Sequence, residues 1–160
     1  MPPRITNPAL SVPGALEALQ SLSKAASDTA TKAGLPQTIL ELVSLRASQI
    51  NGCAVCLDIH TRALRKAGES DERLFTLAAW RDTPYFTDAE RAALRLTEAG
   101  TRLADQADPV PDAVFEEAAK HYDEPALAAL VVCIAAINAW NRLNAITGQV
   151  AGAWTAQWAG

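Results

Sequence analysis

The sequence has no apolar run long enough to cross a bilayer. Its longest run, Ala126–Ile137, is shorter than the roughly 20 residues that a transmembrane helix needs, and therefore predicts a buried core helix. The N-terminus also lacks the apolar stretch after a basic start that marks a secretory signal. These two absences predict a cytoplasmic protein with no membrane partner.

A basic stripe is also missing. The chain carries 14 Lys and Arg residues against 18 Asp and Glu residues, for a net charge of −4, and the basic residues are scattered along it. A nucleic-acid binder needs clustered positive charge to follow a phosphate backbone. The composition therefore predicts no nucleic-acid partner.

No window alternates apolar and polar residues for long enough to indicate a β-strand, whereas nearly every segment shows helical spacing. With 160 residues, 49% of them hydrophobic and 20% charged, the chain has enough material for one sizeable core. Gly, Pro and N-capping residues interrupt the helical pattern and mark where one predicted helix ends and the next begins. We expect one all-helical domain over residues 1–160, a bundle of about seven helices.

The three cysteines are few, but two of them are close together. Cys53 and Cys56 would have Cα atoms roughly 5 Å apart on a helix, which is within disulfide reach. His60 follows Cys56 by four residues, so all three side chains fall within an arc of about 60° on one helix face. In a reducing compartment such a pair is more often catalytic or metal-binding than a structural bridge.

The pair also lies where a helix begins, directly after Asn51-Gly52. Unpaired N–H groups and the positive end of the helix dipole stabilise a thiolate there, which favours attack on a peroxide. A second thiol one turn away would convert a sulfenic acid into a disulfide. A zinc site with Glu41 or water as fourth ligand, or a chance structural pair, stays open, but the phase of His60 favours redox chemistry.

Glu41, Cys53, Cys56 and His60 have a spacing that resembles the AhpD-like alkylhydroperoxidases of the carboxymuconolactone decarboxylase superfamily. The resemblance extends over about residues 36–147 and includes the flanking segments 87–94 and 137–142. It implies an all-helical, AhpD-like fold assembled as a homo-oligomer, often a trimer or hexamer. We expect no metal, because three ligands on one helix turn close a tetrahedral site poorly, and no bound organic cofactor.

The resemblance further implies roles for the four residues. Cys56 would be the peroxidatic cysteine and Cys53 the resolving one, with Glu41 and His60 as the proton relay that activates Cys56. The substrate would be an organic hydroperoxide, and an external dithiol would reduce the disulfide again. One departure is Val55, where some members of the family carry a second histidine.

Two other functions are compatible with parts of this pattern. A redox-sensing or thiol-exchange module would use the same dithiol with weak peroxidase activity. A carboxymuconolactone decarboxylase-like lyase would need cationic residues in its pocket and no thiol, and such members typically lack the cysteine pair.

Several other residues carry weaker expectations. Cys133 lies in an apolar run and is predicted to be a core residue, and His121 is predicted to lie on the surface. The aromatic residues of segment 80–86 could line a pocket, although aromatic residues at a helix end are more often simply packed. Trp154 and Trp158 in the C-terminal tail would be buried on a neighbouring subunit or on their own domain.

Overall fold

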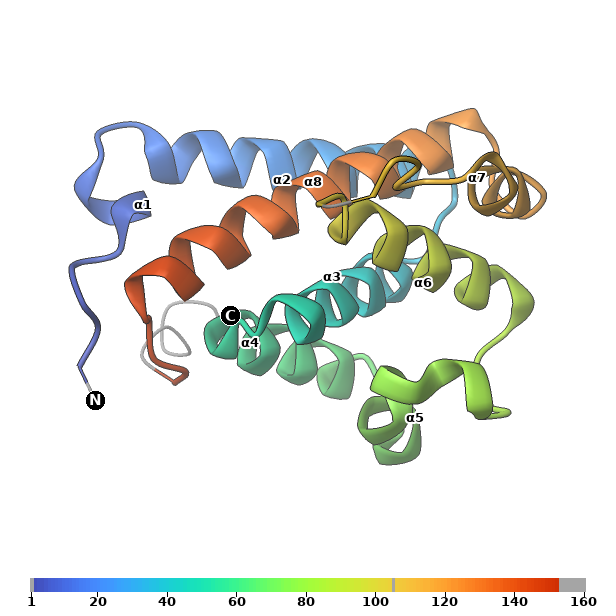
Figure 1. Ribbon diagram of the computed structural model, residues 1–160, viewed down its shortest axis with the longest axis horizontal. Coiled ribbons are helices and arrows are strands. Elements are labelled where there is room, and N and C mark those ends of the chain that lie inside the picture. The colour runs from blue at the N-terminus through green and yellow to red at the C-terminus, as the bar shows by residue number, and fades with distance from the viewer. Residues whose placement is uncertain (1, 105, 153–160) are drawn as a thin grey trace.

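The computed structural model describes residues 2–104 and 106–152. Within those residues the chain is entirely helical and has no strand (Figure 1). The elements are α1 (Pro8–Ser11), α2 (Ala15–Lys32), α3 (Gln37–Asn51), α4 (Ala54–Lys66), α5 (Asp71–Thr76), the 3₁₀ helix η1 (Leu77–Asp82), α6 (Asp88–Thr101), α7 (Asp112–Ala119) and α8 (Glu124–Thr147).

The prediction of about seven helices was one α-helix short over these residues. The missing helix is α1, whose four residues are too few to show a helical period. Its signal is local instead, because the Asn7 side chain accepts the N–H of Ala9 and Pro8 occupies the first turn. The expected helix through Trp80 is also divided, because Ala79 leaves helical geometry inside η1.

Helix α8 is the central element of the fold. It packs along α2 and α3 and also contacts α4, α6 and α7, and Figure 1 shows α2 and α8 side by side above α3 and α4. Its length and composition would allow it to cross a membrane, but 56% of its most apolar window is buried by the rest of the protein. This is the pattern of a core helix, as the run Ala126–Ile137 predicts.

The turn between α3 and α4 places the cysteines. Gly52 ends α3 in the left-handed region, with φ of 66°, a conformation that glycine adopts without steric cost. The chain then reverses, so that Cys53 becomes the N-cap of α4. The predicted stop at Asn51-Gly52 and the predicted helix start at the cysteines are therefore both present.

Apolar side chains surround this turn. A small buried cluster joins the cysteines to α3 and α8, and it consists of Ala47, Cys53, Val55, Cys56 and Ile137. A larger cluster lies between α2, α3, α6, α7 and α8, and another fills the space between α3, α4, α5, η1 and α6. The thiols are therefore held by packed helices rather than by a mobile loop.

Candidate active site

The structure brings the two cysteines into direct contact. Both are reduced, and their sulfur atoms lie 2.7 Å apart, within hydrogen-bond distance. The Cys53 sulfur also accepts the backbone N–H of Cys56 at 3.3 Å, as an N-cap side chain does. Both residues are buried. A disulfide between them therefore needs little movement of the backbone.

These hydrogen bonds divide the charge unequally between the two thiols. The hydrogen bond with Cys56 lowers the pKa of Cys53 to about 6, even though burial alone would raise it. The hydrogen bond with Cys53, together with burial, raises the pKa of Cys56. The surroundings thus favour ionisation of Cys53, which caps the N-terminus of α4, over ionisation of Cys56.

His60 and Glu41 form the second pair in the site. The Nδ1 atom of His60 on α4 lies 2.7 Å from Oε2 of Glu41 on α3, and both side chains are partly buried. Glu41 is therefore not an ordinary solvent-exposed glutamate. Its bond to Nδ1 leaves Nε2 as the ring nitrogen that can accept or release a proton.

Two asparagines of α8 complete the surroundings of the thiols. The amide nitrogen of Asn144 lies 3.4 Å from the sulfur of Cys56, while Asn141 donates to Ser48 and accepts from Asn51. Neither asparagine was predicted from the sequence. Their spacing by three residues on a mainly apolar helix is the signal that could have identified them.

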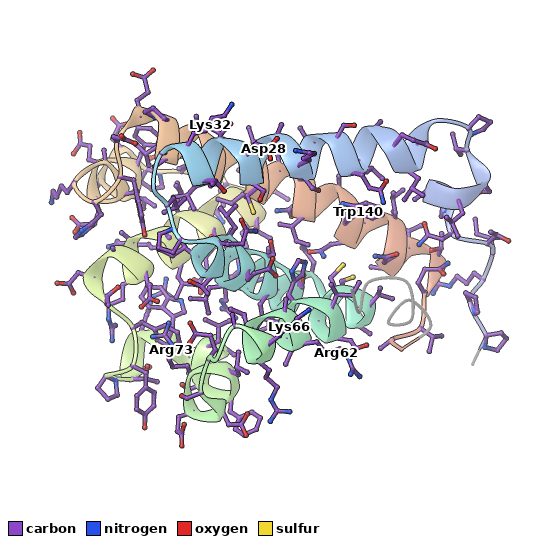
Figure 2. All side chains as sticks on the ribbon, turned by 180° about the vertical axis from the view of Figure 1, so that it is seen from behind. Asp28, Lys32, Arg62, Lys66, Arg73 and Trp140 are labelled. Carbon is purple, nitrogen blue, oxygen red and sulfur yellow. The ribbon has the colours of Figure 1, made fainter. Side chains whose placement is uncertain are left out.

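A cavity of about 470 Å³ opens onto this group of residues. Cys56, His60, Glu41 and Asn144 line it, whereas Cys53 is not among the lining residues. Its walls are mainly apolar and come from α2, α3, α4 and α8. In Figure 2 the yellow sulfur atoms lie between α4 and α8, and Trp140 projects from α8. The apolar wall residues include Leu40, Val55, Ile59, Ala63, Ile137 and Trp140.

Cys133 is buried in the apolar core, as predicted, but it also lines this cavity. Its sulfur lies 3.5 Å from the Ser44 hydroxyl, and burial raises its pKa to about 11. A thiol with this pKa is almost entirely protonated at neutral pH. Cys133 is therefore a poor nucleophile despite its position.

The aromatic residues of segment 80–86 do not line the cavity. Trp80 and Phe86 pack in the hydrophobic core instead, which agrees with the expectation of ordinary packing. His121 is exposed on the surface, as predicted, and its Nε2 atom lies 3.6 Å from Oε1 of Glu117. Trp154 and Trp158 lie outside the described residues.

Across residues 2–104 and 106–152, no group of three or more His, Cys, Asp or Glu side chains could hold a metal ion together. At the cysteine pair His60 directs Nδ1 at Glu41, and the two thiols form a hydrogen bond with each other. The arrangement is suited to moving protons and forming a disulfide.

Comparison with known proteins shows similar chains in several bacteria. The uncharacterized protein YdfG of Bacillus subtilis is 38% identical over 118 residues, which cover 74% of this chain and 79% of YdfG. Alkyl hydroperoxide reductase AhpD of Bradyrhizobium diazoefficiens is 46% identical over 43 residues, which cover 27% of this chain and only 24% of that protein.

Solved structures show the same fold. The Agrobacterium tumefaciens protein ATU0492, of unknown function and named as a candidate antioxidant defence protein AhpD, superimposes with a TM-score of 0.81. The two are 34% identical, and the match covers 93% of this chain and 97% of that one. The debrominase Bmp8, in complex with 2,3,4-tribromopyrrole, shares the fold at 20% identity, with a TM-score of 0.75 and coverage of 93% and 76%.

The predicted AhpD-like, all-helical fold is thereby confirmed. The model of the carboxymuconolactone decarboxylase family matches residues 13–99, more than half of the chain, and that segment contains Glu41, both site cysteines and His60. The chain belongs to the carboxymuconolactone decarboxylase family and is one of its AhpD-like members.

Proposed function

We propose that the protein is a thiol-dependent peroxidase that reduces organic hydroperoxides with the Cys53–Cys56 dithiol. The observation that carries this proposal is the contact of 2.7 Å between the two sulfur atoms at the wall of an apolar cavity. The His60–Glu41 pair lines the same cavity and supplies a route for protons.

Cys56 is the cysteine that meets the peroxide, because it lines the cavity and Cys53 does not. His60 lies one helical turn after Cys56 and accepts its proton, and Glu41 stabilises the imidazolium that results. The Cys56 sulfur attacks the terminal oxygen of the hydroperoxide and the O–O bond breaks. The alkoxide takes the proton from His60 and leaves as an alcohol, and Cys56 is now a sulfenic acid.

Cys53 performs the second step as a thiolate. It attacks the Cys56 sulfur, the S–O bond breaks, and the hydroxide that leaves takes a proton from solvent to become water. The two thiols have then lost two electrons to the peroxide and share a disulfide. An external dithiol returns these two electrons by thiol–disulfide exchange.

The cavity favours organic hydroperoxides over hydrogen peroxide. Its volume of about 470 Å³ lies within the range of small-molecule sites, and its mainly apolar walls bind the organic part of a substrate. Binding of that part holds the O–O bond close to Cys56. Hydrogen peroxide offers no apolar group for these walls to contact.

The residues that line the cavity give less support to the lyase alternative. Among the described residues around the cavity, Lys24 is the only Lys or Arg, and it forms an ion pair with Asp28. A cyclic carboxylate would need cationic groups that are free to bind it. The sensor alternative uses the same dithiol and differs only in its rate of peroxide turnover.

Stoichiometric reduction of cumene hydroperoxide by the reduced protein tests the proposal. Wild-type protein should consume one equivalent rapidly and form the Cys53–Cys56 disulfide. Cys56→Ser should consume none, Cys53→Ser should stop at the sulfenic acid, and the control Cys133→Ser should behave as wild type. Slow oxidation with fast dithiol exchange would favour the sensor, and thiol-independent lactone turnover would favour the lyase.

A further inference from the structure

We propose that Asn144 is a catalytic residue, whose amide donates a hydrogen bond to the reacting sulfur of Cys56, and that Asn7 is the positioning residue that orients this amide. The inference rests on the proposed thiol chemistry at Cys56. It extends the site to the N-terminal segment, which is 137 positions away from Asn144 in the sequence.

The contact between Asn144 and Cys56 carries the first part of the proposal. The Nδ2 atom of Asn144 lies 3.4 Å from the Cys56 sulfur, both residues are buried, and both line the cavity. A donor bonds more strongly to a thiolate than to a neutral thiol, so this amide favours the charged form. It thus opposes the effect of Cys53 and of burial, which both hold the proton on Cys56.

The orientation of the amide carries the second part. The C=O and NH₂ ends of an asparagine have nearly the same shape, so its other hydrogen bonds decide which end faces the sulfur. Asn7 donates its Nδ2 to Oδ1 of Asn144 at 2.7 Å, while its own Oδ1 accepts the backbone N–H of Ala9 at 2.9 Å. A backbone N–H can only donate, so the N–H of Ala9 fixes the orientation of the Asn7 amide. The Asn7 amide in turn fixes the orientation of the Asn144 amide, which therefore directs its NH₂ group at Cys56.

Two hydrogen bonds anchor the N-terminal segment to the C-terminal end of α8 and the residues that follow it. The backbone N–H of Arg4 donates to the carbonyl of Thr147 at 2.8 Å, and Gln149 donates to the carbonyl of Ile5 at 3.0 Å. Asn7 itself is only 3% exposed and lines the cavity. A short helix that only covered the surface would not need a buried amide directed at the thiol site.

The substitution Asn7→Asp reverses the amide with little change of shape. The new carboxylate would still accept the N–H of Ala9, but it could not donate to Asn144. The Asn144 side chain would then turn its NH₂ group toward that carboxylate and its carbonyl toward Cys56. The measurement is the pH dependence of iodoacetamide alkylation at Cys56, followed by fragment-ion mass spectrometry of the reduced protein. Losing a hydrogen bond to a charged group should slow alkylation near neutral pH about 10- to 100-fold and move the midpoint to higher pH.

Three further variants separate this effect from other causes. Asn144→Ala should give the same shift without adding charge, and Asn7→Ser, which can cap α1 but cannot reach Asn144, should also give it. The control Gln149→Ala removes a side-chain anchor of the N-terminal segment and keeps the backbone N–H that donates to the carbonyl of Asn144. It should lower the melting temperature and leave the alkylation profile unchanged.

The proposal is overturned if folded Asn144→Ala and Asn7→Ser keep the wild-type alkylation profile, or if Gln149→Ala shifts it equally. Alkylation requires no peroxide, so the outcome is separate from that of the proposed function. A shifted profile in a protein that fails to reduce hydroperoxides would support the role of the asparagines and refute the peroxidase.

Discussion

Two carboxylates inside this protein, Glu98 on α6 and Glu41 on α3, have very different surroundings. Glu98 accepts hydrogen bonds from Arg46 and Trp80 on one oxygen and pairs with Arg81 and Arg102 on the other. Burial alone would raise its pKa, but these donors outweigh burial and lower the pKa of Glu98 to about 2. Glu98 therefore stays ionised and fixed.

Glu41 instead bonds to the ring of His60, whose other nitrogen stays available to accept or donate a proton. It also lines the same cavity as Cys56, whereas Glu98 joins helices α3 and α6 to η1. The comparison shows that burial of a carboxylate does not by itself indicate function. A carboxylate whose acceptor sites are filled by permanent cations stabilises the fold, and one that faces a titratable partner and an open cavity is suited to chemistry.

The largest expected effect comes from removing the titratable partner. His60→Ala should slow both alkylation of Cys56 and hydroperoxide reduction by roughly 10²–10⁴-fold, the range typical for loss of a general base. Stopped-flow measurement of both rates tests this, and the melting temperature shows whether the fold is retained. Unchanged reactivity of Cys56 would mean that the helix terminus and Asn144 activate it without a relay.

The matched change at the structural carboxylate should act on stability instead. Glu98→Gln leaves the buried Arg46 without its countercharge and should lower the free energy of unfolding by about 3–5 kcal/mol. Hydroperoxide reduction by the folded protein should remain at the wild-type rate. Urea denaturation at pH 7 measures the first quantity, and a slower peroxidase reaction in the folded variant would contradict the comparison.

The pH dependence of this stabilisation follows from the depressed pKa. Because the pKa of Glu98 falls from its ordinary value of 4.5 to about 2 on folding, its contribution of about 3 kcal/mol is fully present above pH 4.5. This contribution to stability is lost as the pH falls from 4.5 to about 2. The difference between wild type and Glu98→Gln should therefore shrink between pH 4.5 and pH 2, and a constant difference would exclude this mechanism.

A smaller effect is expected at Glu41. Glu41→Gln keeps a hydrogen-bond partner for His60 but removes the charge that stabilises its protonated form, so it should slow hydroperoxide reduction less than His60→Ala does. Steady-state rates of both variants against pH make the comparison. Equal losses in the two variants would mean that the charge of Glu41, rather than the ring of His60, controls the reaction.

The smallest effect is expected at Cys133, although it lines the same cavity as Cys56. Its raised pKa keeps it protonated, so Cys133→Ser should leave the rate of hydroperoxide reduction unchanged. Mass spectrometry of the oxidised wild type should show Cys53 joined to Cys56 and Cys133 reduced. A bridge from Cys133 to either of them would refute the assignment of the dithiol.

Several predictions from the sequence stay predictions. They include assembly into a trimer or hexamer, a single domain over residues 1–160, a cytoplasmic location, and the use of an organic hydroperoxide and an external dithiol. The effect of Val55 also belongs here. It is buried beside the cysteines and lines the cavity, so a histidine at this position would add a proton carrier and also disturb the packing.

The sequence by itself determined the helices, the turn at Gly52 and the clustering of Cys53, Cys56 and His60, because these depend on periods, caps and spacings within a few residues. Only the tertiary structure decided that Glu41 meets His60, that Cys56 rather than Cys53 lines the cavity, and that Asn7 and Asn144 join the site. These contacts connect α1, α3, α4 and α8, whose relative placement depends on how the whole core packs. No local pattern encodes that placement, since each helix face is compatible with many partners until the apolar surfaces are buried together.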